Sequence, residues 1–89
     1  MKKYTKDNIP IELIEAAELI AEDKLKKAEP ILRDYLKDDP LDVNAMKLLA
    51  DIGIKFRAYK DAGYLLVRAL DLSPEYDQAR LSYANLLYK

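Results

Sequence analysis

The chain has 89 residues, of which 51% are apolar and 35% are charged, and its formal net charge is -1. A chain of this length forms one small domain, and its balanced charge lacks the basic excess with which proteins neutralise nucleic-acid phosphates. Cysteine and histidine are both absent, which excludes disulfides and thiolate metal sites and removes the commonest metal ligand and general base.

The N-terminal residues are polar and basic, and we expect residues 1–8 to form a flexible tail. The apolar residues that follow are interrupted at short intervals by glutamates, namely Glu12, Glu15, Glu18 and Glu22. This pattern excludes the apolar core of a signal peptide, and no apolar run approaches the roughly 18 residues of a membrane span. We therefore expect a cytoplasmic protein that binds neither membranes nor nucleic acid.

Apolar residues recur three and four positions apart in five segments, which is the spacing of one face of an α-helix. The predicted helices cover residues 11–22, 26–37, 43–56, 59–72 and 75–89, within one all-α domain at residues 9–89. No segment shows the alternation that a half-buried strand needs. The connections are short, so consecutive helices must run antiparallel.

Polar residues next to prolines suggest where three of these helices start. Asp39 and Ser73 each precede a proline and are expected to cap the third and fifth helices. Asn8 is a similar start signal for the first helix. Inside the second helix, Pro30 conflicts with the carbonyl of Lys26, which predicts that this helix starts near Lys27 or bends.

The sequence repeats with a period of 34 residues, because residues 9–42 align with residues 43–76. The identical pairs are Ala16/Ala50, Ile20/Ile54, Lys26/Lys60, Ala28/Ala62, Leu32/Leu66, Leu36/Leu70 and Pro40/Pro74. From Ala28 onward they are four residues apart, along one helix face. The alanines are expected where two helix axes cross, since a methyl group permits a close approach.

This pattern resembles the tetratricopeptide repeat, a helix–turn–helix of 34 residues with small residues and a proline at fixed positions. The matching residues are Leu49, Ala50, Ala62, Ala69 and Pro74 in residues 43–76, and Ala16, Leu19, Ala28, Leu32 and Pro40 in residues 9–42. Met46, Gly53 and Tyr35 depart from it. The resemblance covers two and a half repeats, with residues 77–89 as the partial third.

The resemblance implies a right-handed stack of helical hairpins whose first helices line a groove that binds a peptide or a segment of another protein. The groove residues by family spacing are Leu13, Ala17, Ile20, Asn44, Lys47, Asp51, Ile54, Lys55, Gln78, Leu81, Asn85 and Tyr88. Some family members hold a C-terminal carboxylate with lysine, asparagine and arginine. Here those positions are Leu13, Ala17, Leu48, Gln78 and Ser82, so this carboxylate clamp is absent.

The sequence also argues against catalysis. Without histidine or cysteine, a nucleophile would have to be Ser73, Ser82 or Thr5, with a lysine or a carboxylate as its base. Ser73 is expected to cap a helix, and Ser82 lies in the middle of a helix next to a tyrosine. Gly53 and Gly63 fall inside predicted helices and form no phosphate-binding loop. We expect a non-catalytic protein without cofactor or metal.

Two alternative functions remain open, and a second copy of the chain is a further possible partner. Residues 42–53 and 58–89 also resemble repeat segments that precede bacterial sulfotransferase-type domains, which would make the chain an accessory region of a larger enzyme. It could equally be an excised or designed repeat fragment without its own function. Finally, the stripe of Tyr83, Ala84 and Leu87 lacks the second helix that would cover it in a complete repeat, which predicts self-association through this end.

Overall fold

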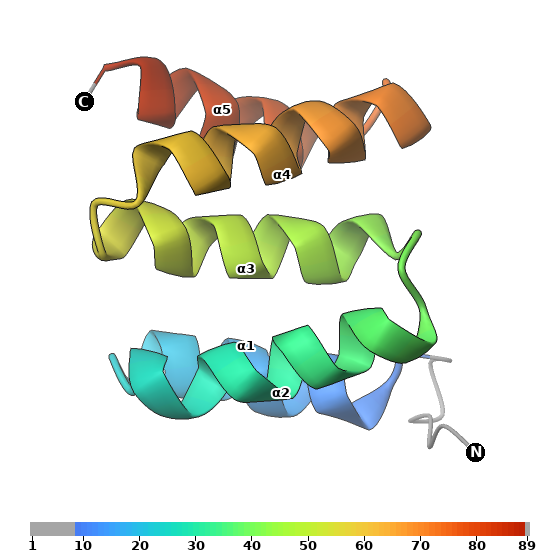
Figure 1. Cartoon of the computed structure of the whole chain (residues 1–89), viewed down its shortest axis with the longest axis vertical. Coiled ribbons are helices and arrows are strands. Elements are labelled where there is room, and N and C mark those ends of the chain that lie inside the picture. The colour runs from blue at the N-terminus through green and yellow to red at the C-terminus, as the bar shows by residue number, and fades with distance from the viewer. Residues whose placement is uncertain (1–8, 89) are drawn as a thin grey trace.

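The computed structural model describes residues 9–88, which form five helices and no strand (Figure 1). The helices are α1 (Ile11–Ala21), α2 (Leu25–Asp38), α3 (Val43–Lys55), α4 (Tyr59–Leu72) and α5 (Asp77–Leu87). The all-α prediction with five helices is therefore confirmed. The predicted tail and the predicted cap Asn8 lie outside the described residues.

The helices stack as two antiparallel hairpins followed by a single helix (Figure 1). α1 pairs with α2 and α3 pairs with α4, and the contact between α3 and α4 is the most extensive of any helix pair. α3 also packs on both helices of the first hairpin, and α5 packs on both helices of the second. The α1–α2 hairpin and α5 therefore lie at opposite ends of a compact body that measures 37 × 28 × 21 Å.

The two hairpins have the same backbone turn. Asp23 and Arg57, which are 34 residues apart, both take a left-handed conformation, with φ of 62° and 63°. In each turn the next backbone N–H reaches back to close the end of the first helix: Lys24 donates to Leu19 and Ala58 donates to Gly53, both at 2.8 Å. This hydrogen-bond pattern ends many helices, but the left-handed position usually carries glycine, because a side chain there costs about 1–2 kcal/mol.

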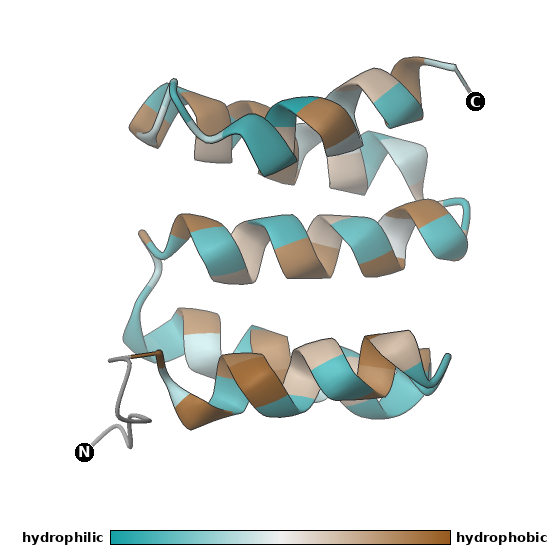
Figure 2. Ribbon diagram, turned by 180° about the vertical axis from the view of Figure 1, so that it is seen from behind, coloured by the Kyte–Doolittle hydropathy of each residue, from teal (hydrophilic) through white to brown (hydrophobic). Residues whose placement is uncertain are grey.

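Every helix is amphipathic, and Figure 2 shows polar and apolar segments alternating along each of them. Two clusters of buried side chains result, one on each side of α3. The first core contains Leu13, Ala16, Leu25, Ala28, Leu32, Tyr35, Ala45, Leu49 and Ile52. The second core contains Ala50, Ala62, Leu66 and Ala79.

The second hairpin has a particularly close crossing at Gly53 of α3 and Ala62 of α4. A Cβ atom added at Gly53 would lie 3.2 Å from the Cβ of Ala62, which is tighter than an ordinary contact. Leu19, the equivalent of Gly53 in the first hairpin, keeps a full side chain that packs against the first core. Ala62 is therefore buried at a crossing, as expected, and Gly53 supplies the space opposite it.

The predicted caps Asp39 and Ser73 are wrong: these residues end α2 and α4, and their backbone N–H groups bond back to Tyr35 and Ala69. The cap of α3 is Asp42, whose Oδ1 accepts a hydrogen bond of 3.1 Å from the backbone N–H of Ala45. α5 follows Tyr76 and has no side-chain cap. The error arises because each proline lies in the connection, before the first turn of the next helix.

α2 begins at Leu25, so the first of the two predicted alternatives, a start near Lys27, is wrong, and the other, a bend of the helix, stays a prediction. Pro30 lies inside this helix and offers no N–H to the carbonyl of Lys26, which would cost about 3 kcal/mol in an isolated helix. The helix continues through it because Leu25, at its first turn, is buried in the first core together with residues further along the same face. Tertiary packing thus outweighs the local penalty.

Candidate functional site

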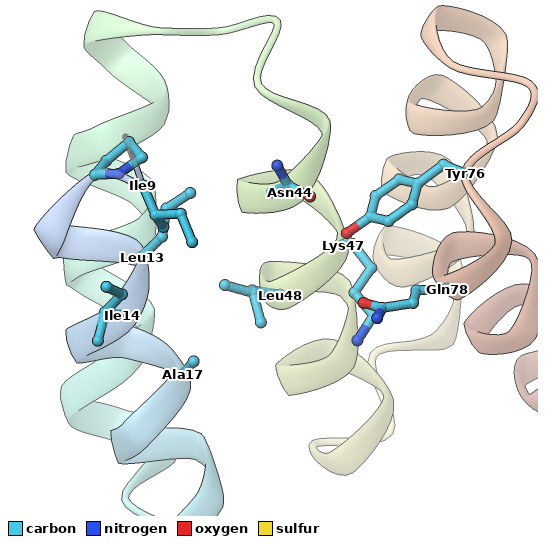
Figure 3. Close-up of a pocket in the computed structure, with 10 residues that line it drawn as sticks. Ile9, Leu13, Ile14, Ala17, Asn44, Lys47, Leu48, Tyr76 and Gln78 are labelled. Carbon is cyan, nitrogen blue, oxygen red and sulfur yellow. The ribbon is translucent and has the colours of Figure 1, made fainter. Parts of the chain in front are cut away.

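The face shared by α1, α3 and α5 carries two hollows, which together we call the groove. The first hollow has a volume of about 340 Å³ and lies between α1 and the N-terminal half of α3 (Figure 3). Its lining residues are Ile9, Pro10, Leu13, Ile14, Ala17, Asn44, Lys47, Leu48, Tyr76 and Gln78. The second hollow has a volume of about 560 Å³ and lies further along the same helices. Its lining residues are Ile20, Asp51, Ile54, Lys55, Arg57, Tyr59 and Asn85.

The first hollow has one apolar and one largely polar wall. Figure 3 shows Ile9, Leu13, Ile14 and Ala17 on the α1 side, facing Asn44, Lys47, Leu48, Tyr76 and Gln78 from α3 and the region where α5 begins. The apolar wall is accessible, since Ile9 is 44% exposed. Such a wall can bury an apolar side chain of a ligand, while the opposite wall offers hydrogen-bond donors and acceptors.

A polar network joins the two hollows. Lys47 lines the first hollow and Asp51 the second, and Lys47 Nζ lies 2.7 Å from Asp51 Oδ2. Ser82 of α5 donates a hydrogen bond of 2.9 Å to Asp51 Oδ1. Both carboxylate oxygens of Asp51 are therefore engaged. The side chains of Lys47 and Asp51 are only 19% and 24% exposed, so solvent screens this pair less than a surface ion pair.

Tyr76 lies at the junction between α4 and α5 and lines the first hollow together with Lys47. Burial raises the pKa of the Tyr76 phenol above its ordinary value of 10.0, and the nearby charges of Asp51 and Asp42 raise that pKa further. The phenol therefore stays neutral over the physiological range and presents an O–H group at the edge of the first hollow.

Ten of the twelve groove residues predicted from the sequence line the two hollows. The exceptions are Leu81 and Tyr88, which are 71% and 88% exposed and line neither hollow. The lining residues that were not predicted are Ile9, Pro10, Ile14, Leu48, Arg57, Tyr59 and Tyr76. Ile14 and Leu48 are apolar residues 34 positions apart, so the sequence repeat could have identified them as lining residues. The others lie at helix starts or in connections, where helical spacing gives no information.

Around the predicted stripe on α5, two side chains are open to solvent and one is not. Ala84 is exposed and Leu87 is 70% exposed, whereas Tyr83 is half-buried against the second core. Tyr64 of α4 is also 67% exposed. Self-association through this end stays a prediction, which light scattering at micromolar and millimolar concentrations would test.

Residues 9–88 contain no group of three or more carboxylates placed to hold a metal ion. None of the described helices is long and apolar enough to cross a membrane. Comparisons of the sequence with known protein families and with curated proteins find no match.

Proposed function

We propose that the chain is a tetratricopeptide-like repeat protein that binds a segment of another protein in the groove, without catalysing a reaction. The observation that carries this proposal is the accessible groove itself, in which an apolar wall on α1 faces polar groups on α3 and α5. Protein-binding grooves combine apolar anchoring sites with a few polar contacts in this way.

The recurrence of the backbone supports the assignment to a repeat architecture. α2 and α4 have equal lengths and begin 34 residues apart, and α3 and α5 also begin 34 residues apart. The small residues at the repeat positions Ala16, Ala28, Ala50 and Ala62 are fully buried between helices. A stack of this kind contacts mainly neighbouring units, which leaves one continuous face of first helices free for a partner.

A selection from a randomised decapeptide library on the purified chain tests the proposal. Ala17 is exposed and lines the first hollow, so Ala17→Trp fills the space that an apolar anchor would occupy. Ala84 is exposed and lines neither hollow, so Ala84→Trp is the matched control. We expect enriched peptides to bind the wild type and Ala84→Trp alike, and to bind Ala17→Trp at least about tenfold more weakly, which corresponds to about 1.4 kcal/mol.

Two results would contradict this function. Either the selection enriches no peptide on the wild type, or the enriched peptides bind Ala17→Trp as tightly as the control. Thermal melts of both variants establish that each is folded before its affinity is compared.

A further inference from the structure

We infer that the second hollow binds carboxylate side chains, so that the ligand of the groove is an acidic peptide segment with an apolar residue near its acidic part. This inference rests on the proposed function and specifies the chemistry of the partner. It depends on the charge of the hollow, on the charge of the edge where the hollow opens, and on the backbone conformation of Arg57.

The second hollow contains two cations that have no partner among the described residues. Lys55 and Arg57 are both exposed and make no ion pair within residues 9–88. The one carboxylate in this lining, Asp51, is already paired with Lys47 and accepts a hydrogen bond from Ser82. An anionic ligand would therefore meet two free positive charges, and the negative charge of Asp51 is largely balanced.

The surrounding edge of the molecule has the same sign. The hairpin turns, residues 22–27 and 55–61, carry six basic and three acidic side chains. The opposite edge, residues 34–42 and 71–77, carries one basic and seven acidic side chains. Within residues 9–88, positive charge is thus concentrated where the second hollow opens, which attracts an acidic ligand and orients it along the groove.

The backbone at Arg57 supplies an independent argument. Its φ of 63° is the conformation that favours glycine, and an arginine costs stability there. Its counterpart Asp23 has the same conformation but lines a different hollow, together with Lys24 and Phe56. Arginine at this strained position places a guanidinium group beside the groove, and a guanidinium binds a carboxylate through two parallel hydrogen bonds.

The spacing of the two hollows sets the spacing of the ligand groups. The α3 residues of the first hollow precede those of the second by about seven positions, or about 10 Å at the 1.5 Å rise of a helix. An extended chain covers that distance in about three residues. We expect the apolar anchor and the acidic residues to be separated by this interval.

The experiment repeats the decapeptide selection on the wild type, Arg57→Gly, Asp23→Gly and Lys55→Gln. On the wild type we expect enrichment of Asp and Glu about three positions from an apolar residue. Arg57→Gly relieves strain and is expected to be folded and more stable than the wild type, so weaker binding by this variant would not reflect unfolding. Asp23→Gly makes the same backbone change without removing a groove cation, and is the matched control.

For the enriched acidic peptides, measured by fluorescence anisotropy, we expect binding about two- to fivefold weaker with Arg57→Gly or Lys55→Gln. With Asp23→Gly we expect binding unchanged or slightly tighter, because this variant removes a negative charge from the same edge. Added salt should weaken binding to the wild type more than binding to a Lys55→Gln/Arg57→Gly double variant. Enriched peptides without acidic residues, or equal affinity for Arg57→Gly and Asp23→Gly, would overturn this inference and leave the proposed function standing. The absence of any enriched peptide would instead reject the proposed function.

Discussion

The first core is filled mainly by large side chains, whereas the second core, between the second hairpin and α5, is filled mainly by alanines. Leu13, Leu25, Leu32 and Tyr35 fill the first core, while Ala50, Ala62, Ala69 and Ala79 are fully buried in and around the second hairpin. The turns of the two hairpins nevertheless match closely in their dihedral angles. The same backbone unit can therefore be filled either by large side chains or by a closer approach of its helices.

Equivalent positions also have different roles at the two junctions that follow the hairpins. At the first junction, Tyr35 donates a hydrogen bond of 2.7 Å to Asp42, the cap of α3. One period later these positions are Ala69 and Tyr76, and α5 has no side-chain cap. The first junction is thus fixed by a hydrogen bond between two side chains. At the second junction Tyr76 packs against the second core and the Arg80 guanidinium donates a hydrogen bond to the carbonyl of Pro74. Exchanging residues between equivalent positions tests these differences.

The largest effect is expected from Tyr35→Ala, which gives the first hairpin the residue of the second. Tyr35 is only 4% exposed, and loss of a buried aromatic ring costs about 3–5 kcal/mol of unfolding free energy. Chemical denaturation measures this value. Tyr35→Phe, which keeps the ring and removes only the hydroxyl bond to Asp42, should cost about 1 kcal/mol. Equal losses for the two variants would show that the ring does not support the first core.

A smaller effect is expected from Gly53→Leu, which gives the second hairpin the residue of the first. The space opposite Ala62 already leaves only 3.2 Å for a Cβ atom, so a leucine forces α3 and α4 apart at a cost of about 1–3 kcal/mol. Lys60→Leu adds a leucine at an exposed position of α4 and should be nearly neutral. Identical melting temperatures for the two variants would contradict the close crossing.

The two turns should respond alike to relief of their strain. Asp23→Gly and Arg57→Gly each place glycine at a φ near 60°, and each should stabilise the fold by about 1 kcal/mol. Thermal melts of the single and double variants check this, and the double variant should show the sum because the turns belong to different hairpins. A stabilisation confined to one turn would show that the turns are not equivalent.

The smallest effect concerns pH. The pKa of Tyr76 is raised in the folded chain, above all by burial, so its stabilising contribution is complete below pH 10 and is lost as pH rises through the folded pKa. Carbon NMR of labelled tyrosines should show one phenol that ionises above the ordinary value, and Tyr76→Phe should remove that signal. The same variant should lessen the loss of stability in alkali. A Tyr76 resonance with an ordinary pKa would contradict the buried setting.

Helical periodicity predicted much of the fold because it is a local property. Residues three and four positions apart share a face wherever the chain is helical, so the five helices followed from spacing alone. Most lining residues of the groove followed from the resemblance to the tetratricopeptide repeat. Lys47 and Asp51 are four positions apart on α3, so their ion pair also follows from helical spacing. Only the start of α2 was misjudged inside a helix, because packing of Leu25 outweighs the penalty of Pro30.

The connections could not be predicted in this way. Asp39 and Asp42 are equally good capping residues in the sequence, and the path of the chain into α3 makes Asp42 the cap and Asp39 the end of α2. Likewise, nothing in the sequence places Tyr76 beside the groove or turns Arg57 toward the second hollow. These positions depend on how one helix leaves the stack and the next one enters it.

The sequence by itself thus determined the helices, their period and the small residues at their crossings, since each of these follows from interactions between residues close in the chain. Tertiary structure alone decided that Ser82 would bond to Asp51 across 31 positions, that Lys55 and Arg57 would have no ion-pair partner among residues 9–88, and that Gly53 would lie against Ala62. Those features require helices that are distant in sequence to dock at a particular depth and angle, and the volumes of the buried side chains between them set both.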